Sequence, residues 1–391
     1  PQESRTDRPE AVQYIDPYKL LSCLWLNLNQ HAGHIVRRAP AFGDVQQPLA
    51  AVVLVHAVGD LRYEDVPTPV REPGEVLMKV HACGICGSDI PRIFKKGTYH
   101  FPTIPGHEFA GEIIDADDKS LVGKKAAVFP LIPCGHCAAC QTGEYAHCSH
   151  YDYYGSRRDG GFAEYIAVKE WNLVFFDDRV SYEEAAMCEP AAVALHSVGR
   201  GNVRIGDTVA IFGAGPIGIM LGLWSRTAGA AKVILCDIDQ TKTDFADSLG
   251  FTAVNSRNID PVEFIREQTG GKGADVCIEG AGVSQTFEQA LRSAKAKGHV
   301  VCMGNPAGDM TLTQNGYWEI LRKELTVRGT WNSLYNDAKN DWRTTMEAIA
   351  SHRIDVRPLI SHKFHLSESE QAFGVILGRK EFFNKVMFVN E

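Results

Sequence analysis

The chain has 391 residues, of which 45% are hydrophobic and 23% charged, and its formal net charge is -8. This length accommodates two domains, and the composition is that of a globular protein rather than a disordered or fibrous one. The negative charge and the lack of a long Lys/Arg run argue against a nucleic-acid partner. No apolar run approaches the roughly 20 residues of a membrane span, so no membrane is expected and a reducing cytoplasm is the expected compartment.

Residues 1–48 differ in sequence pattern from the rest of the chain. They are rich in polar residues and proline and show no alternation of apolar and polar residues. A short helix around 18–28 is compatible with their composition. Three interpretations are open: a poorly ordered extension, a wrongly assigned start or expression remnant, and a targeting peptide. Acidic residues near the beginning argue against a targeting peptide, so the first two are preferred.

From about residue 50 to about 174, short strands alternate with turns. The run GEVLMKVHACG places Val76, Met78 and Val80 on one face of a strand. This texture predicts a small β-barrel-like domain. A helical stretch follows, and Ser181 with Glu184 is typical of a capping box at its start.

The pattern then changes to alternating strands and helices. DTVAIFGAGPIGIMLGLWSRTAGAAKVILCDID reads as strand, glycine turn, helix and strand. Helices are predicted over 241–250 and 284–298, and strands over 274–282 and 299–306. The alternation predicts an α/β fold with a parallel, doubly wound sheet. The last stretch, about 338–391, returns to mixed short elements and is expected to pack on the first domain.

A glycine motif lies between the first strand and the first helix of this region. It is built from Gly213, Gly215, Pro216, Ile217 and Gly218. In this strand–turn–helix context, glycines let the backbone approach a pyrophosphate at the helix N-terminus. Asp237 ends the next strand, where it can accept hydrogen bonds from ribose hydroxyls and would repel a 2′-phosphate, which favours NAD over NADP. The alternative is that the glycines serve only helix–strand packing.

Four of the eleven cysteines are concentrated in one short run with the spacing C-x2-C-x2-C-x7-C. They are Cys134, Cys137, Cys140 and Cys148. Four thiolates at this spacing suit a closed tetrahedral zinc site. A disulfide knot is disfavoured in a reducing compartment, and an iron–sulfur cluster is the remaining alternative. A closed site of this kind holds a loop in place, so reactive chemistry must lie elsewhere.

A second group of metal-ligand residues is dispersed along the chain. Cys86 lies in CGICGSD, His107 and Glu108 lie in PGHEF, and Glu189 lies in CEP. Thiolate, imidazole and carboxylate can together hold one zinc with an open position, as hydride-transfer chemistry needs. Taken singly, Cys86 could be a core thiol, His107 a core histidine and Glu189 an acid on a helix surface. Their occurrence beside the four-cysteine run and the dinucleotide motif favours the metal.

The order of CGICGSD, GHEFAGE, the four-cysteine loop, DGGFAEY, EP and GAGPIG resembles the zinc-dependent medium-chain dehydrogenases over about 51–391. The resemblance implies a GroES-like catalytic domain formed by 49–195 and 338–391, interrupted by a Rossmann domain at 196–337. It also implies NAD as coenzyme, two zinc ions per chain, and a homodimer or homotetramer that pairs partly through the strand in 326–333.

The resemblance further implies roles for single residues. In the polyol branch of the family the catalytic zinc is held by Cys, His and Glu, and both Glu108 and Glu189 are retained because the ligating glutamate can change with substrate. The position five residues after Cys86 is Pro91, where related enzymes carry a relay histidine, so Ser88 and solvent form the expected proton route. Asp89 is expected to orient the ligating imidazole.

The implied reaction is the oxidation of a secondary hydroxyl of a sugar alcohol phosphate, with galactitol 1-phosphate as substrate and tagatose 6-phosphate as product. Arg92, Arg157 and Arg158 are the candidate phosphate ligands, because guanidinium offers paired donors. Lys95 and Lys96 fit a solvated basic face equally well. The alternatives are a dehydrogenase of sorbitol, L-iditol or another polyol, and a non-catalytic nucleotide-binding relative, against which the intact set of metal ligands argues.

Overall fold

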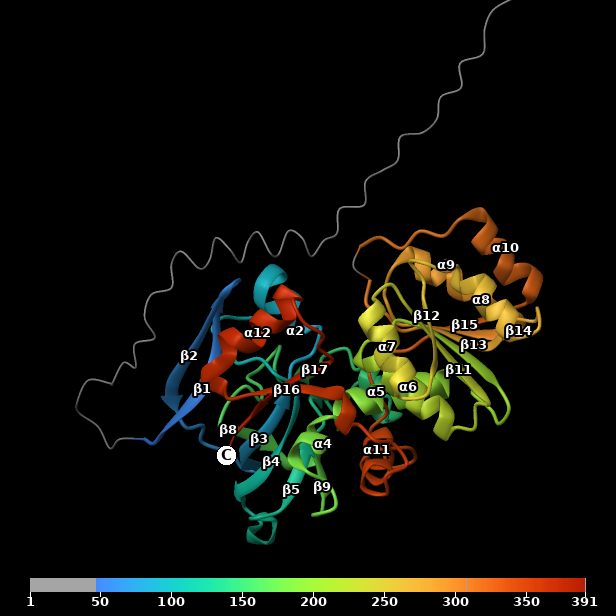
Figure 1. Cartoon of the computed structure of the whole chain (residues 1–391). Coiled ribbons are helices and arrows are strands. Elements are labelled where there is room, and N and C mark those ends of the chain that lie inside the picture. Colours follow the sequence, from blue (N-terminus) through green and yellow to red (C-terminus); the bar gives the residue numbers. More distant parts are fainter. Residues whose placement is uncertain (1–46, 307, 391) are drawn as a thin grey trace, which may run out of the picture.

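The computed structural model describes residues 47–306 and 308–390. The N-terminal extension up to residue 46, with the helix considered around 18–28, therefore lies outside the described residues. The described chain forms two parts, each built on its own large sheet (Figure 1). The predicted α/β class, with a β-rich part and a doubly wound part, is confirmed. Within this described part of the chain, no helix is long and apolar enough to cross a membrane.

The β-rich part combines the first half of the chain with the C-terminal strands. Its main sheet has the order β16-β17-β3-β4-β5-β9, with β8 on β3, and β1 pairs with β2 in a separate hairpin. In β3, Val76, Met78 and Val80 are fully buried, as the alternation predicted. The capping box of Ser181 and Glu184 is also present at the start of α4. The strands are β1 (Leu49–Ala57), β2 (Asp60–Pro67), β3 (Glu75–Gly84), β4 (Glu108–Asp115), β5 (Lys125–Val128), β6 (Leu131–Ile132), β7 (Asp152–Tyr153), β8 (Tyr165–Lys169), β9 (Leu173–Phe176), β16 (Ile360–Phe364) and β17 (Lys385–Val389). The helices are α2 (Asp89–Pro91), η2 (Arg92–Lys96), η3 (Lys119–Leu121), α3 (Ala138–Gln141), η4 (Tyr145–His147), η5 (Glu170–Asn172), α4 (Tyr182–Ala186), η6 (Arg357–Leu359), η7 (Leu366–Glu368) and α12 (Ser369–Gly378).

The second part is a parallel sheet with the strand order β12-β11-β10-β13-β14-β15. Counted within this part the order is that of the doubly wound dinucleotide-binding fold, and the order reverses between β10 and β13. Its central strands β10, β11 and β13 are mainly apolar and buried because helices cover both faces of the sheet. The strands are β10 (Thr208–Phe212), β11 (Lys232–Asp237), β12 (Thr252–Asn255), β13 (Ala274–Glu279), β14 (Ala294–Cys302) and β15 (Thr326–Gly329). The helices are α6 (Pro216–Thr227), α7 (Gln240–Ser248), α8 (Pro261–Gln268), α9 (Ser284–Ser293) and α10 (Gln314–Lys323). Helices α5 (Cys188–Gly201) and α11 (Asp341–Ala350) pack against each other, and α11 also contacts β9 of the first part.

The structure differs from the sequence reading in one helix boundary. The helix predicted over 284–298 ends at Ser293, and the following residues begin β14. Ala294 pairs with Ala274 across the parallel ladder, and Lys297 has a φ of 60° that a helix does not tolerate. Tertiary pairing therefore overrides the helical propensity of the AKAK stretch. In the doubly wound part, β12, α8 and α10 were not predicted.

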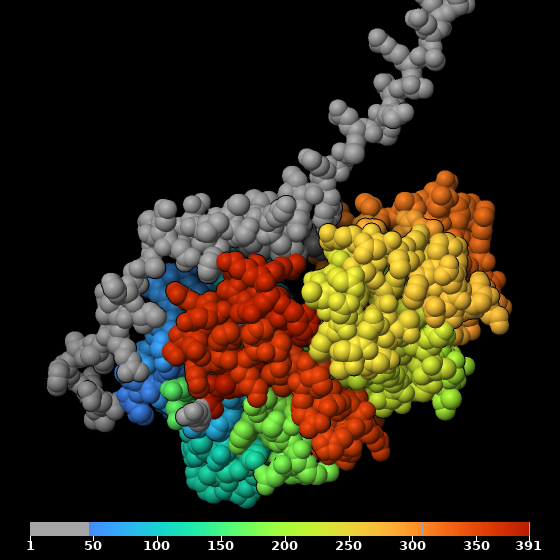
Figure 2. Space-filling model, viewed as in Figure 1, coloured from blue at the N-terminus to red at the C-terminus, as the bar shows by residue number. Residues whose placement is uncertain are grey.

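Helix α5 lies between the two sheets (Figure 1), and it contacts β4 of the first part, α6 of the second part and α11. The C-terminal residues, red in Figure 2, abut the yellow helices of the second part, and the rings of Phe382 and Phe245 lie 5.2 Å apart. The N-terminus of α5 thus brings Glu189 to the junction of the two parts.

Candidate active site

Three metal-ligand residues converge at one end of the β3–β4 pair. The ligand atoms of Cys86, His107 and Glu108 all lie within 4.8 Å of one another. Sheet register produces this meeting, because Gly84 at the end of β3 pairs with Glu108 at the start of β4. A Cβ on Gly84 would lie 2.2 Å from Glu108 Oε2, so only glycine leaves room for the carboxylate. Thiolate, imidazole and carboxylate in one shielded place form a donor set that fits zinc.

The negatively charged groups around His107 stabilise a positive charge on or beside its imidazole ring. Asp89 is fully buried, and its Oδ1 lies 3.3 Å from His107 Nδ1. Burial lowers the pKa of His107, but the charges of Asp89 and Cys86 outweigh burial and raise it well above its ordinary value. The backbone N–H of Cys86 donates to the other oxygen of Asp89 at 3.0 Å. Asp89 therefore lies where a carboxylate can orient a ligating imidazole.

The two candidate glutamates have different environments. Glu108 is ion-paired with the buried Lys385, whose Nζ lies 2.8 and 2.6 Å from its two oxygens. Glu189 lies outside the group of three ligand atoms and accepts the hydroxyl hydrogen of Tyr153 at 3.5 Å. Burial raises the pKa of Glu189 to about 7, while the charge of His107 acts in the opposite direction. Glu108 is thus paired with a lysine, whereas Glu189 can exchange a proton near neutral pH.

The hydroxyl of Ser88 already takes part in two hydrogen bonds. Ser88 Oγ donates to Cys86 Sγ at 3.2 Å and accepts a hydrogen bond from Arg92 Nη1 at 2.8 Å. The same Arg92 nitrogen lies 3.5 Å from Asp89 Oδ1. A serine that passes on a proton from this position must first release its contact with the cysteine sulfur. Arg92 brings a positive charge next to the group of three ligands.

Arg157 lies at the end of an aromatic path that leads to this group. Its guanidinium carbon lies 4.6 Å from the ring centre of Tyr99 and 4.2 Å from that of Tyr151. The Tyr151 ring is 6.2 Å from Tyr153, whose ring is 5.7 Å from His107. Hydrogen bonds to Tyr151 O and the Tyr99 hydroxyl use two of the five guanidinium donors. The remaining donors are available to an anion.

Arg158, the neighbouring candidate, takes part in different contacts. Its Nε lies 2.8 Å from Asp152 Oδ2, and its guanidinium lies 5.4 Å from the Tyr154 ring centre. It lines a separate groove of about 360 Å³ that also includes Glu75. The structure therefore distinguishes Arg157, beside the tyrosine rings, and Arg92, beside Ser88 and Asp89, from Arg158. Lys95 and Lys96 follow Arg92 on the exposed side of η2.

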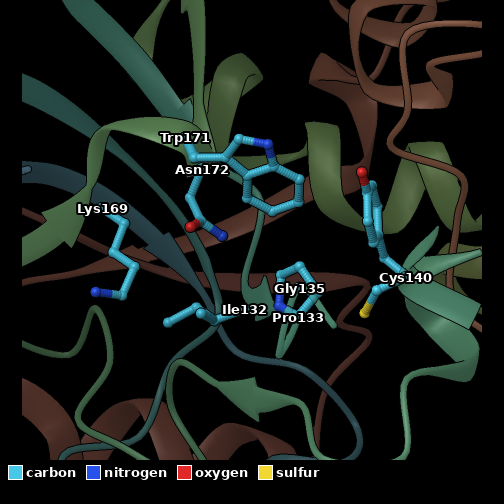
Figure 3. A pocket seen from close by; sticks show the side chains of 8 residues that line it. Ile132, Pro133, Gly135, Cys140, Lys169, Trp171 and Asn172 are labelled. Atoms are coloured by element: carbon cyan, nitrogen blue, oxygen red, sulfur yellow. The ribbon is translucent and has the colours of Figure 1, made fainter. Parts of the chain in front are cut away.

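The four cysteines of the C-x2-C-x2-C-x7-C run form a second cluster within 4.8 Å. The sulfur of Cys140 lies 3.5 Å from that of Cys137 and 3.9 Å from that of Cys134. A disulfide needs about 2.05 Å, so the disulfide alternative is excluded. The backbone N–H of Cys140 lowers the pKa of Cys137 to about 5, which favours the thiolate that a metal binds. Four thiolates in this arrangement fit a closed zinc site. A groove of about 280 Å³ lies beside Cys140. Trp171 and Lys169 also line it (Figure 3).

The glycine motif has the geometry that a pyrophosphate requires. Gly213 has a φ of 113°, and a Cβ on Gly218 would lie 1.9 Å from Gly213 O. A Cβ on Gly215 would meet open space, and Pro216 is the first residue of α6. The carboxylate of Asp237 accepts hydrogen bonds from the N–H groups of Ala214 at 2.8 Å and Asp239 at 3.0 Å. Asp237 thus borders the glycine turn, and Ile217 follows in the first turn of α6.

Sequence reasoning missed Lys385 and the tyrosines. Lys385 meets Glu108 across 277 residues of chain, and Tyr99 meets Arg157 across 58. The contacts depend on the pairing of β17 with β3 and on the folding of two loops. No local pattern signals either contact.

Comparisons with known proteins agree with this geometry. Residues 72–178 match a family model described as the alcohol dehydrogenase GroES-like domain, and residues 216–351 match one described as a zinc-binding dehydrogenase. Galactitol 1-phosphate 5-dehydrogenase of Escherichia coli K12 is 35% identical over 315 residues, which are 79% of this chain and 91% of that protein. Sorbitol dehydrogenase of Bacillus subtilis is 32% identical, over 88% of this chain and 98% of that protein.

Solved structures give the same result. A crystal structure of galactitol-1-phosphate dehydrogenase from Escherichia coli has a TM-score of 0.82 at 33% identity, covering 87% of this chain and all of that one. A zinc-binding dehydrogenase from Sinorhizobium meliloti bound to NADP has a TM-score of 0.81 at 32% identity, covering 88% of this chain and 100% of that one. Both described parts of the chain are thus matched together, in one arrangement.

Proposed function

The chain belongs to the zinc-dependent medium-chain dehydrogenase family, and from this premise we propose that it oxidises a secondary hydroxyl of a sugar alcohol phosphate. The proposed substrate is galactitol 1-phosphate, the product tagatose 6-phosphate, and the hydride acceptor NAD. The observation that carries the proposal is the position of Arg157. Its guanidinium lies between two tyrosine rings and keeps hydrogen-bond donors that can bind an anion. A row of aromatic rings connects it to the candidate metal ligands. The 35% identity with galactitol 1-phosphate 5-dehydrogenase supports the same substrate.

As a member of this family the protein binds zinc. In the proposal, Cys86 and His107 hold the catalytic ion together with Glu108 or Glu189, and the four-cysteine cluster holds a second ion. When bound, the catalytic zinc supplies a Lewis acid that makes the substrate hydroxyl easier to deprotonate. Asp89 fixes the orientation of the imidazole.

The chain's own residues provide a place for the proton. Both oxygens of Glu108 accept hydrogen bonds from Lys385 Nζ, so Glu108 is poorly placed to take up the proton. Glu189 is buried, and its pKa of about 7 suits a group that accepts a proton near neutral pH and returns it to solvent. Ser88 is the second candidate carrier, once its hydroxyl turns away from Cys86.

The phosphate is bound, in this proposal, by Arg157 and Arg92 rather than by Arg158. Arg92 lies beside Ser88 and Asp89, and Arg157 approaches from the loop that follows the four-cysteine run. Two guanidinium groups approaching from different elements can share the charge of one phosphate dianion. Arg158 is occupied by Asp152 and is directed into another groove.

The coenzyme assignment rests on Asp237 within a nicotinamide-dependent family. Its carboxylate borders the glycine turn at the end of β11, where the adenosine ribose is expected. A second negative charge on a 2′-phosphate would be repelled there, so NAD is proposed over NADP. The pyrophosphate is expected at the glycine motif.

An oligomer is also proposed. Strand β15 is the last strand of its sheet, and one edge of β15 has no neighbouring strand in the described chain. Val327 within it is 37% exposed and Trp331 just after it is 55% exposed. Pairing of two such edges would form a homodimer with a continuous sheet. The proposed domains are 49–195 with 338–391, and 196–337.

The first test compares NAD reduction by zinc-loaded protein with galactitol 1-phosphate, galactitol and sorbitol at matched concentrations. Preference for the phosphate is the expected result. Arg157→Gln should raise KM for the phosphate by about tenfold or more, the value of a charged hydrogen bond, and leave the free polyols unchanged. Arg158→Gln is the matched control and should resemble the wild type. Equal or better use of free polyols by the wild type would refute the phosphate site and leave a polyol dehydrogenase.

A second candidate is a dehydrogenase of free sorbitol, which the 32% identity with the Bacillus subtilis enzyme favours. The same assay decides between the two substrates. A non-catalytic relative is opposed by the intact donor groups at both metal sites. Metal analysis tests that alternative, because two zinc ions per chain are expected of an active enzyme and one of a protein that keeps only the closed site.

A further inference from the structure

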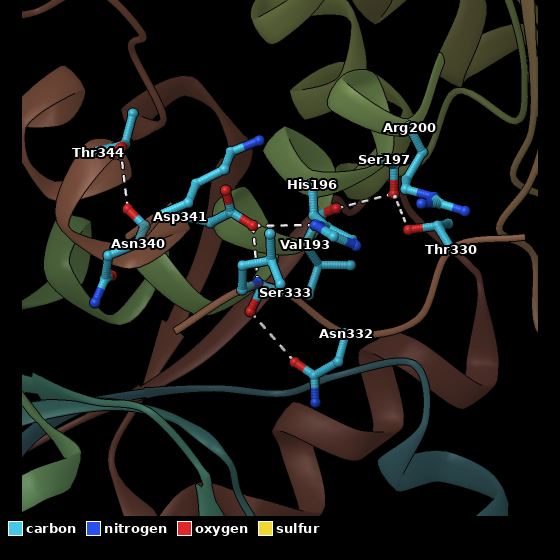
Figure 4. A network of polar contacts seen from close by, with 12 residues as sticks. Val193, His196, Ser197, Arg200, Thr330, Asn332, Ser333, Asn340, Asp341 and Thr344 are labelled. Carbon is cyan, nitrogen blue, oxygen red and sulfur yellow. Dashed lines mark hydrogen bonds and ion pairs between the residues drawn. The ribbon is translucent and has the colours of Figure 1, made fainter. Parts of the chain in front are cut away.

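Residues 330–340, which we call the crossing segment, run from the edge strand β15 to the β-rich domain. Figure 4 shows this segment against the C-terminal half of α5. At its start, the Thr330 N–H donates to Cys302 O at 3.1 Å, which continues the ladder between β14 and β15. Thr330 Oγ1 also lies 3.3 Å from the buried Ser197 of α5. The beginning of the segment is therefore tied both to the sheet and to α5.

A contact between a histidine and a buried carboxylate holds the other end of the segment. His196 Nδ1 of α5 lies 3.1 Å from Asp341 Oδ2, the first residue of α11 (Figure 4). The same oxygen accepts the Leu334 N–H at 2.8 Å, and the Asp341 N–H donates to Leu334 O at 2.9 Å. Asp341 is 1% exposed, so these contacts form in a region of low dielectric where they are strong. One carboxylate thus fixes the crossing segment to α5.

Further contacts make the segment rigid. Trp342 is buried, and its indole N–H donates to Ser333 Oγ at 3.0 Å. Tyr335 stacks on Phe129 of the β-rich domain at 4.3 Å, and its hydroxyl donates to Trp171 O at 3.0 Å. The segment therefore contacts both domains, and the contact between His196 and Asp341 lies between these two sets of contacts.

The crossing segment begins on the side of the sheet where the nicotinamide half of the coenzyme is expected. In a doubly wound sheet the dinucleotide lies across the carboxyl ends of the strands. Asp237 places the adenosine at the end of β11, on one side of the reversal between β10 and β13. The nicotinamide half then extends to the other side, toward the ends of β13, β14 and β15. Cys302 and Gly329 end β14 and β15 side by side, so the crossing segment begins at this edge.

We propose that His196 and Asp341 are positioning residues for the nicotinamide half of the coenzyme, acting by holding the crossing segment in place. The proposal rests on the proposed binding of NAD. It assigns neither residue to direct contact with the coenzyme. Glu189 lies two turns before His196 on the same helix, so the segment and the metal site share one rigid support.

The test measures binding by calorimetry, with NAD and with ADP-ribose, which lacks the nicotinamide. His196→Leu and Asp341→Asn should each weaken NAD binding by about tenfold, the value of one charged hydrogen bond, and leave ADP-ribose binding unchanged. His196→Asn keeps a donor for the carboxylate and should restore most of the NAD affinity. If His196→Leu does not fold, the comparison of His196→Asn with Asp341→Asn still tests the proposal.

Asp275→Asn is the matched control. Asp275 likewise accepts a backbone N–H, from Thr208 at 2.8 Å, and pairs with a cation, Lys295, but it lies at the amino ends of the strands. Its variant should bind both ligands as the wild type does. The inference is wrong if NAD affinity is unchanged in both His196→Leu and Asp341→Asn, or if NAD and ADP-ribose binding fall equally. A wild type that binds ADP-ribose but not NAD would instead refute the proposed coenzyme.

Discussion

The ion pair between Lys385 and Glu108 allows a quantitative prediction. Lys385 is 4% exposed and Glu108 is 1% exposed, and the shortest distance between nitrogen and oxygen is 2.6 Å. Lys385→Met keeps the length of the side chain and removes its charge. The carboxylate of Glu108 then remains buried without this cationic partner, which raises the free energy of the folded state.

The magnitude follows from burial. Breaking a buried pair by removing one partner costs about 3–5 kcal/mol, whereas an exposed pair contributes about 0–1 kcal/mol. Lys119→Met is the matched control, because Lys119 lies at the same 2.6 Å from Asp115 but its side chain is 72% exposed. Glu108→Gln combined with Lys385→Met removes both charges and should recover most of the loss.

The assay is urea unfolding followed by fluorescence, with all variants at one pH. For a denaturant slope of about 3 kcal/mol/M, Lys385→Met should lower the midpoint by about 1 M or more. Lys119→Met should lower it by less than about 0.3 M. The reasoning is refuted if Lys385→Met falls within the range of the surface control, or if the double variant is no more stable than the single one.

Three further predictions concern pH, coenzyme and helix capping. In chelator-treated protein the free energy of unfolding should fall as pH rises from about 4.5 to about 7, because burial raises the pKa of Glu189 and the folded state holds that proton more tightly. Urea unfolding at several pH values should show this decline in the wild type and its loss in Glu189→Gln; an unchanged slope in the variant would contradict the assignment. Asp237→Gly should shift the ratio of kcat/KM for NAD over NADP by about tenfold or more toward NADP, and an unchanged ratio would place discrimination elsewhere. Ser181→Ala should cost about 1 kcal/mol through loss of the capping box, measured by thermal unfolding against Ser120→Ala in an exposed turn; equal melting temperatures would contradict it.

Features formed by residues close in sequence could be predicted without a structure. The glycine motif between β10 and α6 is one strand–turn–helix unit, and Asp237 follows at the end of the next strand. The four cysteines lie in one short run, so the turns between them suffice to gather the sulfur atoms. The capping box spans the four residues 181–184 at one helix start. In each case local backbone geometry decides the contact.

The C-terminal boundary of α9 could not be predicted from local sequence. The AKAK stretch has helical propensity, but pairing of Ala294 with Ala274 draws it into β14. A propensity of a few tenths of a kcal/mol per residue cannot compete with completion of a parallel ladder. The short β12 and α8 lacked enough length to give a periodic signal.

By itself, the sequence determined the family, the two sets of candidate metal ligands and the dinucleotide motif, because these depend on residue type and short spacing. Only the tertiary structure decided which charges meet. It paired Lys385 with Glu108 across 277 residues and His196 with Asp341 across 145, and it directed Arg157 rather than Arg158 along the path to the metal ligands. Adjacent arginines are alike in sequence, and their side chains separate only when the loop is placed against the sheet. Long-range partners are set by strand register and domain packing, which local spacing does not encode.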